Sequence, residues 1–392
     1  MTVQALVAGV GMIPFAKPGA SDSYDVMGAN AARAALNDAG ISYDQVQQAY
    51  VGYVYGDSTA GQSALYPVGL SGIPIINVNN NCSTGSTALF LARQAVASGV
   101  VDCALALGFE QMSPGALGTI YGDRKPTMEL HTGVMARAQA ADASPGAAQL
   151  FGGAGREYAE KHGTRDATFA KISEKARKHA ANNPFAIFRD PLTIEEILAS
   201  KPIYGPLTRY QCCPPTCGAA AAVVVSPAFA AKHGLKGVEI LAQAMTTDTG
   251  RSFEKDSMIE VVGYGMAEAA AQAVFEQAGV GPDEVDVVEL HDCFTANELL
   301  TYEAIGLTPL GTAERFIWDG DNSYGGRIVT NPSGGLLSKG HPLGATGLAQ
   351  CTELVWQLRG QAEARQVEGA RVALQHNLGL GGACVVTLYR QA

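Results

Sequence analysis

The chain has 392 residues, of which 46 are glycine and only 16% are charged. This length accommodates two or three domains with a large core, and the composition is typical of a closely packed α/β protein, not a disordered or fibrous one. The net charge of −10 argues against nucleic-acid binding, which requires a basic face.

The two ends and the apolar stretches carry no recognisable targeting or membrane signal. Residues 1–5 lack the basic segment of a signal peptide, and residues 389–392 do not form a peroxisomal signal. No apolar stretch reaches the roughly 20 residues of a membrane span. We therefore expect a cytoplasmic protein without a membrane span.

Eight cysteines stand at irregular spacing, which indicates free thiols and not a disulfide framework. Cys212, Cys213 and Cys217 lie close together and raise the alternative of a zinc site. Zinc sites need further histidines or cysteines at a fitting spacing, and none follows here. We prefer buried structural thiols and expect no metal.

The predicted elements alternate along the first part of the chain. Residues 3–10 predict a buried strand, residues 25–39 a helix that ends at Gly40, and residues 46–54 a second strand. A further helix over 89–97 is followed by a strand over 103–107.

A similar sequence pattern recurs later in the chain. Residues 274–285 parallel residues 35–46, with a helix, a glycine stop and a Val-rich strand in both. The helix predicted over 348–358 and the strand over 372–375 repeat the earlier pair. Chance similarity between Ala- and Gly-rich helices is the alternative explanation; we prefer a duplicated fold with a pseudo-two-fold axis.

The repeat places two reactive side chains at matching positions. Cys82 stands three residues before Gly85, and His341 stands three residues before Gly344. Each precedes the same helix of its half, so we expect the thiol and the imidazole to meet near the axis. A helix N-terminus and a nearby imidazolium lower the pKa of a thiol, which favours Cys82 as a nucleophile.

Between the halves, residues 113–201 differ in composition from the rest of the chain. One helical stretch, predicted over 156–180, carries many lysines and arginines. Such a positive patch in an acidic protein suits an anionic ligand such as a phosphorylated nucleotide. A solvated helix face is the alternative.

Two further stretches carry chemistry. His291 and Cys293 follow a strand predicted over 285–290, at the end of a strand where α/β proteins place their sites. Residues 375–383 predict a Gly-rich loop whose backbone N–H groups could hold an oxyanion. Two thiols with two imidazoles suit Claisen-type carbon–carbon cleavage, which needs a nucleophile and a separate acid/base.

Four motifs together give the chain a family resemblance. They are Asn81-Cys82-Ser83-Thr84-Gly85, His291-Asp292-Cys293-Phe294, the stretch 331–347 with Gly340-His341-Pro342, and the ending His376-Asn377-Leu378-Gly379-Leu380-Gly381-Gly382. This combination resembles the thiolase superfamily, and within it the sterol carrier protein type. Most thiolases have Asn-Glu-Ala-Phe where this chain has His-Asp-Cys-Phe.

The resemblance implies a role for each matching residue. Cys82 matches the nucleophile that becomes acylated, and His341 matches the histidine that activates it and helps to hold the thioester oxygen. Cys293 takes the role of the acid/base thiol, and His291 replaces the usual asparagine of the oxyanion hole. The backbone amides of Cys82 and Gly381 would form a second oxyanion hole. Cys217 stands where the family has an aspartate, which leaves the role of that turn open.

The resemblance also implies the fold. It is an α/β thiolase fold, in which two βαβαβαββ halves form a five-layered αβαβα arrangement with an inserted loop domain. The first half would span residues 1–115 and be completed by about 205–232. The loop domain would span 116–204 and receive coenzyme A (CoA), and the second half would span 233–392.

The implied activity is the CoA-dependent thiolytic cleavage of 3-ketoacyl-CoA, as in fatty-acid β-oxidation, or the reverse condensation. CoA is then a co-substrate, no other cofactor is expected, and branched or sterol-derived chains are candidate substrates. A homodimer or homotetramer is expected. One alternative is a retro-aldolase that acts on steroid side-chain CoA thioesters with a partner protein, although such enzymes lack the cysteine nucleophile. A non-catalytic carrier of acyl-CoA or lipid is the other.

Overall fold

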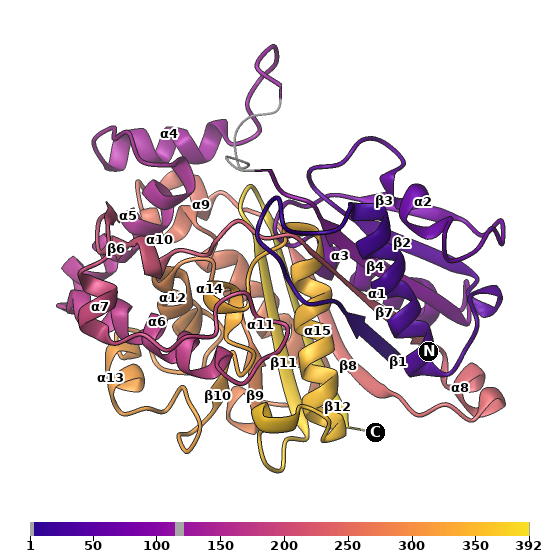
Figure 1. Ribbon diagram of the computed structural model, residues 1–392. Coiled ribbons are helices and arrows are strands. Elements are labelled where there is room, and N and C mark those ends of the chain that lie inside the picture. Colours follow the sequence, from indigo (N-terminus) through magenta and orange to yellow (C-terminus); the bar gives the residue numbers. More distant parts are fainter. Residues whose placement is uncertain (1–3, 114–120, 392) are drawn as a thin grey trace.

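The computed structural model describes residues 4–113 and 121–391, so the domain boundary expected at 115 and 116 lies outside the described residues (Figure 1). The first half begins with the strand and helix that the sequence predicts. Its elements are β1 (Ala5–Met12), α1 (Tyr24–Ala39), β2 (Gln48–Gly52), α2 (Ala60–Leu65), β3 (Ile75–Val78), α3 (Thr84–Ala97), β4 (Cys103–Glu110) and β7 (Gly218–Val225). Every residue of β7 is buried, because α1 packs on one face of this strand and α15 (Leu343–Arg359) on the other, which explains its alanines and valines after Gly218.

The second half repeats this order of strands and helices. Its elements are β8 (Val238–Thr246), α11 (Tyr264–Ala278), β9 (Val287–Glu289), α12 (Thr295–Ala304), β10 (Val329–Thr330), α15 (Leu343–Arg359), β11 (Val372–Gly379) and β12 (Ala383–Gln391). The loop predicted over 375–383 is wrong in part, because β11 continues through Gly379 and pairs with β12 up to Ala383. Only residues 380–382 form the turn between the two strands.

The two halves also share one strand topology. They form a ten-stranded sheet in the order β10-β9-β11-β12-β8-β1-β7-β4-β2-β3. In each half the second strand lies between the third and the fourth and is parallel to both, and the last strand lies antiparallel between the fourth and the first. The halves join where β1 and β8 pair antiparallel, with Leu6 opposite Glu239. The predicted duplication is confirmed.

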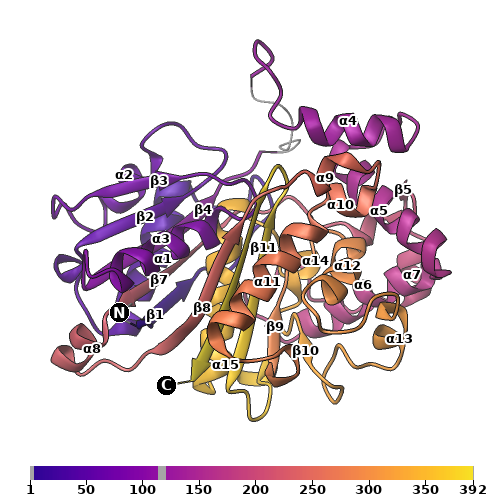
Figure 2. The ribbon, with the colours of Figure 1, turned by 180° about the vertical axis from the view of Figure 1, so that it is seen from behind.

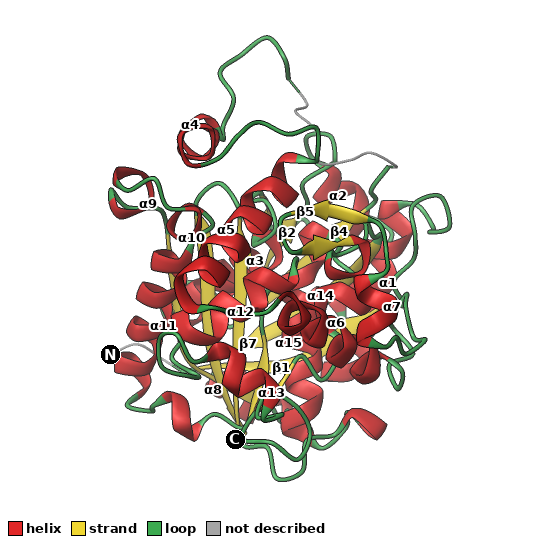
Figure 3. Ribbon diagram, turned by 90° about the vertical axis from the view of Figure 1, so that its left-hand side faces the viewer, coloured by secondary structure: helices red, strands yellow, loops and turns green. Residues whose placement is uncertain are grey.

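Helices α3 and α15 form the middle layer. Their apolar side chains share one core cluster with residues of both halves of the sheet, while α1 and α11 pack on the outer faces (Figures 2 and 3). Glycine lets the two central helices meet: a Cβ on Gly85 would lie 2.8 Å from the carbonyl oxygen of Gly344. The N-termini of α3 and α15 are therefore brought together, and with them the loops that precede each helix.

The middle segment forms a helical region beside the second half (Figure 1). Its described elements are α4 (Glu129–Ala138), α5 (Gly146–His162), α6 (Asp166–Ala180), α7 (Ile194–Leu198), β5 (Pro202–Tyr204) and β6 (Leu207–Thr208). The single helix predicted over 156–180 is wrong, because Gly163 takes a left-handed conformation (φ 72°) that ends α5. The other α-helices of the described residues are α8 (Pro227–His233), α9 (Arg251–Glu254), α10 (Met258–Val261), α13 (Ala313–Trp318) and α14 (Gly335–Ser338).

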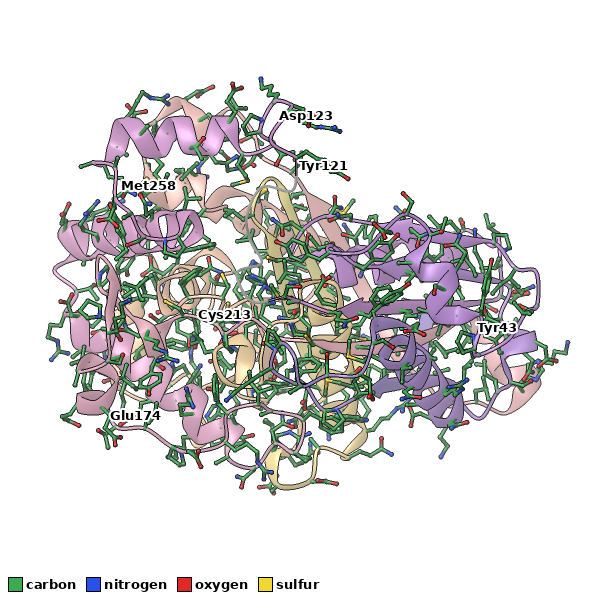
Figure 4. The ribbon with its side chains drawn as sticks, turned by 45° about the horizontal axis from the view of Figure 1, so that its top comes forward. Tyr43, Tyr121, Asp123, Glu174, Cys213 and Met258 are labelled. Carbon is green, nitrogen blue, oxygen red and sulfur yellow. The ribbon has the colours of Figure 1, made fainter. Side chains whose placement is uncertain are left out.

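The basic residues of α6 divide between the interior and the surface. Lys175 is buried and forms an ion pair with Glu298 of α12, so its charge is neutralised inside the protein. Lys171 pairs instead with Glu174 at 2.7 Å, and Glu174 lies at the outer edge of the molecule (Figure 4). The predicted positive patch is therefore smaller than the sequence suggests.

Among the described residues, none of the helices combines the length and the apolar character that crossing a membrane requires.

Candidate active site

Three predicted site residues converge between the halves. The Sγ atom of Cys82 and ring nitrogens of His291 and His341 all lie within 4.8 Å of one another. Cys82 and His341 come from the loops before α3 and α15, and His291 comes from the loop between β9 and α12. The two imidazole rings lie 5.0 Å apart, nearly perpendicular at 84°. The matching positions of Cys82 before Gly85 and of His341 before Gly344 therefore predicted correctly that these two side chains lie close together.

His341 is held from both its backbone and its ring. Its N–H donates to Thr216 Oγ1 at 3.0 Å, and its Nδ1 lies 2.7 Å from Thr346 Oγ1. The Thr346 hydroxyl donates its one hydrogen to Pro342 O at 3.0 Å, so we assign the ring proton to Nδ1. The buried Nε2 has no hydrogen-bond partner among the described residues, and its lone pair is available to take a proton.

The ring of His291 is held by Asn377 of β11. Asn377 Nδ2 lies 3.0 Å from His291 Nδ1 and donates to the carbonyl oxygen of Cys82 at 3.1 Å. The His291 backbone N–H lies 3.4 Å from His376 Nδ1. Burial, with His341 and His376 nearby, holds the pKa of His291 well below its usual value, so the ring is neutral.

Cys293 lies beside a third thiol, Cys213, which the sequence suggested as a structural thiol or a zinc ligand but not as part of this site. Cys212 and Phe294 form an antiparallel bridge, so Cys213 stands opposite Cys293 and donates its N–H to Cys293 O at 2.9 Å. Figure 4 shows Cys213 near the centre of the molecule. Burial raises the pKa of both thiols well above the usual value, with a further contribution from Cys82. The Cys-Cys-Pro stretch thus contributes to this site.

The expected lowering of the Cys82 pKa is wrong for the resting site. Burial, followed by the charge of Glu110, raises the pKa of Cys82 to about 12. Burial also lowers the pKa of His341 to about 3, so this ring is neutral and provides no positive charge beside the thiol. Each isolated charge is disfavoured here, but proton transfer from Sγ to Nε2 would create both charges together as an adjacent pair.

Glu110 is a buried carboxylate that the sequence analysis missed. It ends β4 and accepts hydrogen bonds from the backbone N–H groups of Val54, Tyr55 and Gly344, at 3.1, 2.9 and 3.0 Å. Burial outweighs these bonds and raises its pKa to about 7. Glu110 therefore connects the first half to the N-terminus of α15. A charged residue at the end of an otherwise apolar strand is the signal that could have identified it.

The other predicted residues have different surroundings. Gly381 lies in the turn between β11 and β12 with φ 103°, next to Leu380, whose carbonyl oxygen accepts from Asn81 Nδ2 at 2.8 Å. Cys384 is fully buried in β12. Cys217 is also fully buried, and its N–H donates to Ala16 O at 2.8 Å, which indicates a structural turn.

The zinc alternative can be compared with the described residues. There, the side chains of Cys212, Cys213 and Cys217 do not form a group with metal-binding distances. Within residues 4–113 and 121–391, the one group of this kind is the cluster of Cys82, His291 and His341. The same closeness is what a nucleophile and its proton acceptor require.

The comparisons with known proteins agree with this site and fold. Residues 5–196 match the family model "Thiolase, N-terminal domain", and residues 250–388 match "Thiolase C-terminal domain-like". The chain belongs to the thiolase family. It is accordingly an acyltransferase by family.

Within the family the chain is of the sterol carrier protein type. It is 57% identical over 392 residues to "Sterol carrier protein 2" of Rattus norvegicus, covering 99% of this chain and 72% of the relative. It is 44% identical over 392 residues to "Non-specific lipid-transfer protein-like 2" of Caenorhabditis elegans, covering 98% of this chain and 95% of that relative.

Two solved structures share the fold. An "Ltp2-ChsH2(DUF35) aldolase" aligns with a TM-score of 0.83 and 24% identity, over 99% of this chain and 97% of that one. Human mitochondrial 3-ketoacyl-CoA thiolase in complex with CoA aligns with a TM-score of 0.75 and 20% identity, over 100% and 98%. The predicted thiolase fold is confirmed.

Proposed function

We propose that the chain catalyses the CoA-dependent cleavage of 3-ketoacyl-CoA through an acyl group carried on Cys82. The observation that supports this most strongly is the convergence of the Cys82 thiol with the imidazoles of His341 and His291, within 4.8 Å. A thiol beside an unpartnered imidazole nitrogen is the arrangement of an activated nucleophile. A second imidazole beside the same thiol provides a separate hydrogen-bond donor.

In the first half-reaction, His341 Nε2 takes the proton from Cys82 Sγ while the sulfur attacks the 3-keto carbon. The bond between C2 and C3 then breaks, and its electron pair passes to the thioester as an enolate. The thiol of Cys293 gives its proton to C2, which releases acetyl-CoA, or propionyl-CoA from a 2-methyl substrate, as the first product. Cys82 keeps the remaining acyl group as a thioester.

In the second half-reaction, the Cys293 thiolate takes the proton of an incoming CoA thiol. The CoA sulfur attacks the acyl group on Cys82, and the tetrahedral intermediate collapses. Cys82 leaves with the proton that His341 holds, so every group returns to its starting state. The chain-shortened acyl-CoA is the second product.

Two oxyanion holes are proposed for these steps. The backbone N–H groups of Cys82 and Gly381 hold the oxygen at the former 3-keto carbon. His291, with His341, holds the thioester oxygen where the enolate charge develops. Loss of one oxyanion donor typically costs about 10²- to 10³-fold in rate.

The substrate class and the assembly are part of the proposal. CoA and 3-ketoacyl-CoA are the expected ligands, with branched or sterol-derived chains as candidate substrates. A homodimer or homotetramer is expected, as is a location in the cytoplasm. The retro-aldolase alternative has one supporting observation, the structural likeness to the aldolase. The presence of Cys82 beside His341 favours thiolysis instead.

The test is a thiolysis assay with acetoacetyl-CoA and CoA, followed by straight-chain, 2-methyl and steroid-derived 3-ketoacyl-CoA. We expect Cys82→Ala to keep the fold and CoA binding but to lose thiolysis. Cys384→Ala is the matched control, because this thiol lies in the core strand β12, and it should keep the activity. Undiminished turnover by Cys82→Ala would contradict the mechanism.

A further inference from the structure

Asn377 lies between the two residues whose chemistry the proposed function depends on. Its Nδ2 is 3.1 Å from Cys82 O and 3.0 Å from His291 Nδ1. A carbonyl oxygen can only accept, so the amino group of Asn377 must be the end that faces Cys82. This amino group has two hydrogens, and the second is directed at His291 Nδ1. His291 Nδ1 is therefore an acceptor.

Further hydrogen bonds fix the orientation of the Asn377 side-chain amide. Ser86 Oγ, in α3, donates to Asn377 Oδ1 at 2.8 Å and accepts from Gln375 Nε2 at 2.7 Å. Gln375 Nε2 also donates to Gly347 O, which can only accept, at 2.6 Å. The orientation of Gln375 is therefore fixed as well.

Tyr389 completes the row of hydrogen bonds. Its hydroxyl donates to Gln375 Oε1, so all the bonds run in one direction from Tyr389 to His291. Every member is buried, so water cannot substitute for a missing bond in the resting protein. The row joins the strands β12 and β11 to the start of α3, so both halves of the fold contribute to it.

A neutral imidazole has two tautomers, and only one of them donates from Nε2. We propose that Asn377, oriented by Ser86 and Gln375, is the positioning residue that fixes His291 in the Nε2–H tautomer. His291 then presents an N–H to the thioester oxygen of the substrate. This inference rests on the proposed function, since it explains how His291 becomes an oxyanion donor.

The direct test observes the tautomer without any turnover. The chain has seven histidines, so selective ¹⁵N-histidine labelling gives few signals, and His291→Asn identifies the one of His291. We expect the wild-type spectrum to place the proton on Nε2. Asn377→Asp replaces the donor with an acceptor of the same shape, and we expect the proton to move to Nδ1. A wild-type proton on Nδ1, or no change in Asn377→Asp, would overturn the proposal.

The kinetic test uses a double-mutant cycle. In the wild-type background, Asn377→Asp should lower kcat about 10²-fold with little change in KM, because an oxyanion donor acts in the transition state. Asparagine has no tautomers, so in the His291→Asn background the same change should cost less than about 3-fold. An equal loss in both backgrounds would mean that Asn377 acts in another way and would overturn the proposal.

A further variant guards against misfolding of Asn377→Asp, which buries a charge. Asn377→Ala removes the donor without adding a charge, and it should give a mixture of both His291 tautomers. A single Nε2–H tautomer in this variant would contradict the proposal. If the wild-type chain showed no thiolysis, the proposed function would fail, but the spectra would still decide whether Asn377 sets the tautomer.

Discussion

The pairing of Cys82 with His341 gives the sharpest prediction. In His341→Asn the half-buried thiol loses the base that takes its proton during the reaction, while an amide of similar size remains beside Thr346. The Sγ atom of Cys82 and a ring nitrogen of His341 lie at most 4.8 Å apart. At an effective dielectric constant of 20 the attraction between the charges that form on them is worth about 3.5 kcal/mol, so we expect the acylation of Cys82 by acetoacetyl-CoA to slow by roughly 300-fold.

The pH dependence of the resting thiol gives a second measurement. Burial raises the pKa of Cys82 to about 12 and lowers that of His341 to about 3, so at neutral pH the thiol is protonated and the imidazole is neutral. Because only the thiolate reacts, the rate of Cys82 alkylation by iodoacetamide should rise about tenfold per pH unit from 6 to 9 in the wild-type chain. His341→Asn should keep this slope, because a neutral imidazole does not change the charge beside the resting thiol.

Alkylation is measured by quenching at intervals and locating the label on Cys82 by peptide mass spectrometry. His233→Asn, on the exposed end of α8, is the matched control and should behave as the wild-type chain does. The reasoning is refuted if acetoacetyl-CoA acylates Cys82 in His341→Asn within threefold of the wild-type rate at pH 7.5. It is also refuted if the wild-type alkylation rate is independent of pH from 6 to 9.

Three further predictions concern Cys293, the packing of α15 on β4 and a buried carboxylate. Cys293→Ala should still acylate Cys82 in a single turnover, but its steady-state kcat should fall roughly 10²- to 10⁴-fold. Gly344→Ala should lower the free energy of unfolding by about 3 kcal/mol, because its Cβ would lie 2.3 Å from Phe109 O. The control is Gly146→Ala, where the added Cβ meets open space. In the same urea titration it should change the free energy of unfolding by less than about 0.5 kcal/mol. Burial raises the pKa of Glu110 from 4.5 to about 7, so the folded chain binds more protons than the unfolded chain between these values. The free energy of unfolding should therefore fall by up to about 3 kcal/mol as the pH rises through this range, and Glu110→Gln should remove this slope.

Each of these three has a clear contrary outcome. Normal steady-state turnover by Cys293→Ala would assign the acid/base role to another group, with the thiol of Cys213 opposite it as the first candidate. Equal stability of the two glycine variants would contradict the close packing of the start of α15 against the end of β4. A steeper fall of stability with pH in Glu110→Gln than in the wild-type chain would contradict the raised carboxyl pKa.

The sequence predicted the parts of the site that depend on local pattern. The glycines of the α3 and α15 starts recur at the same distance from Cys82 and His341, because neither position has room for a Cβ. At Gly85 it would meet the backbone of α15, and at Gly344 it would meet Phe109 O at the end of β4. The repeated order of strands and helices then implied one location for both loops. The position of His291 at the end of a strand followed from the same rule of α/β folds.

Other features depend on contacts that no local pattern contains. Asn377 lies in a segment predicted as a loop, yet it contacts Cys82, 295 residues away in sequence. The inward position of Lys175 follows from its ion pair with Glu298, which periodicity alone cannot place. The direction of the Cys82 pKa shift also depends on burial in the assembled site, which outweighs the helix end expected to lower it.

The most direct test of the whole account is to trap the acyl group. The chain is incubated with acetoacetyl-CoA without free CoA, and the reaction is quenched in acid. The protein is then digested, and the masses of its peptides are measured by mass spectrometry. We predict one acetyl group, on Cys82, which disappears when CoA is added and never forms in Cys82→Ala. An acetyl group on Cys293 or Cys213 instead, or none on any cysteine while thiolysis proceeds, would contradict the central role of Cys82.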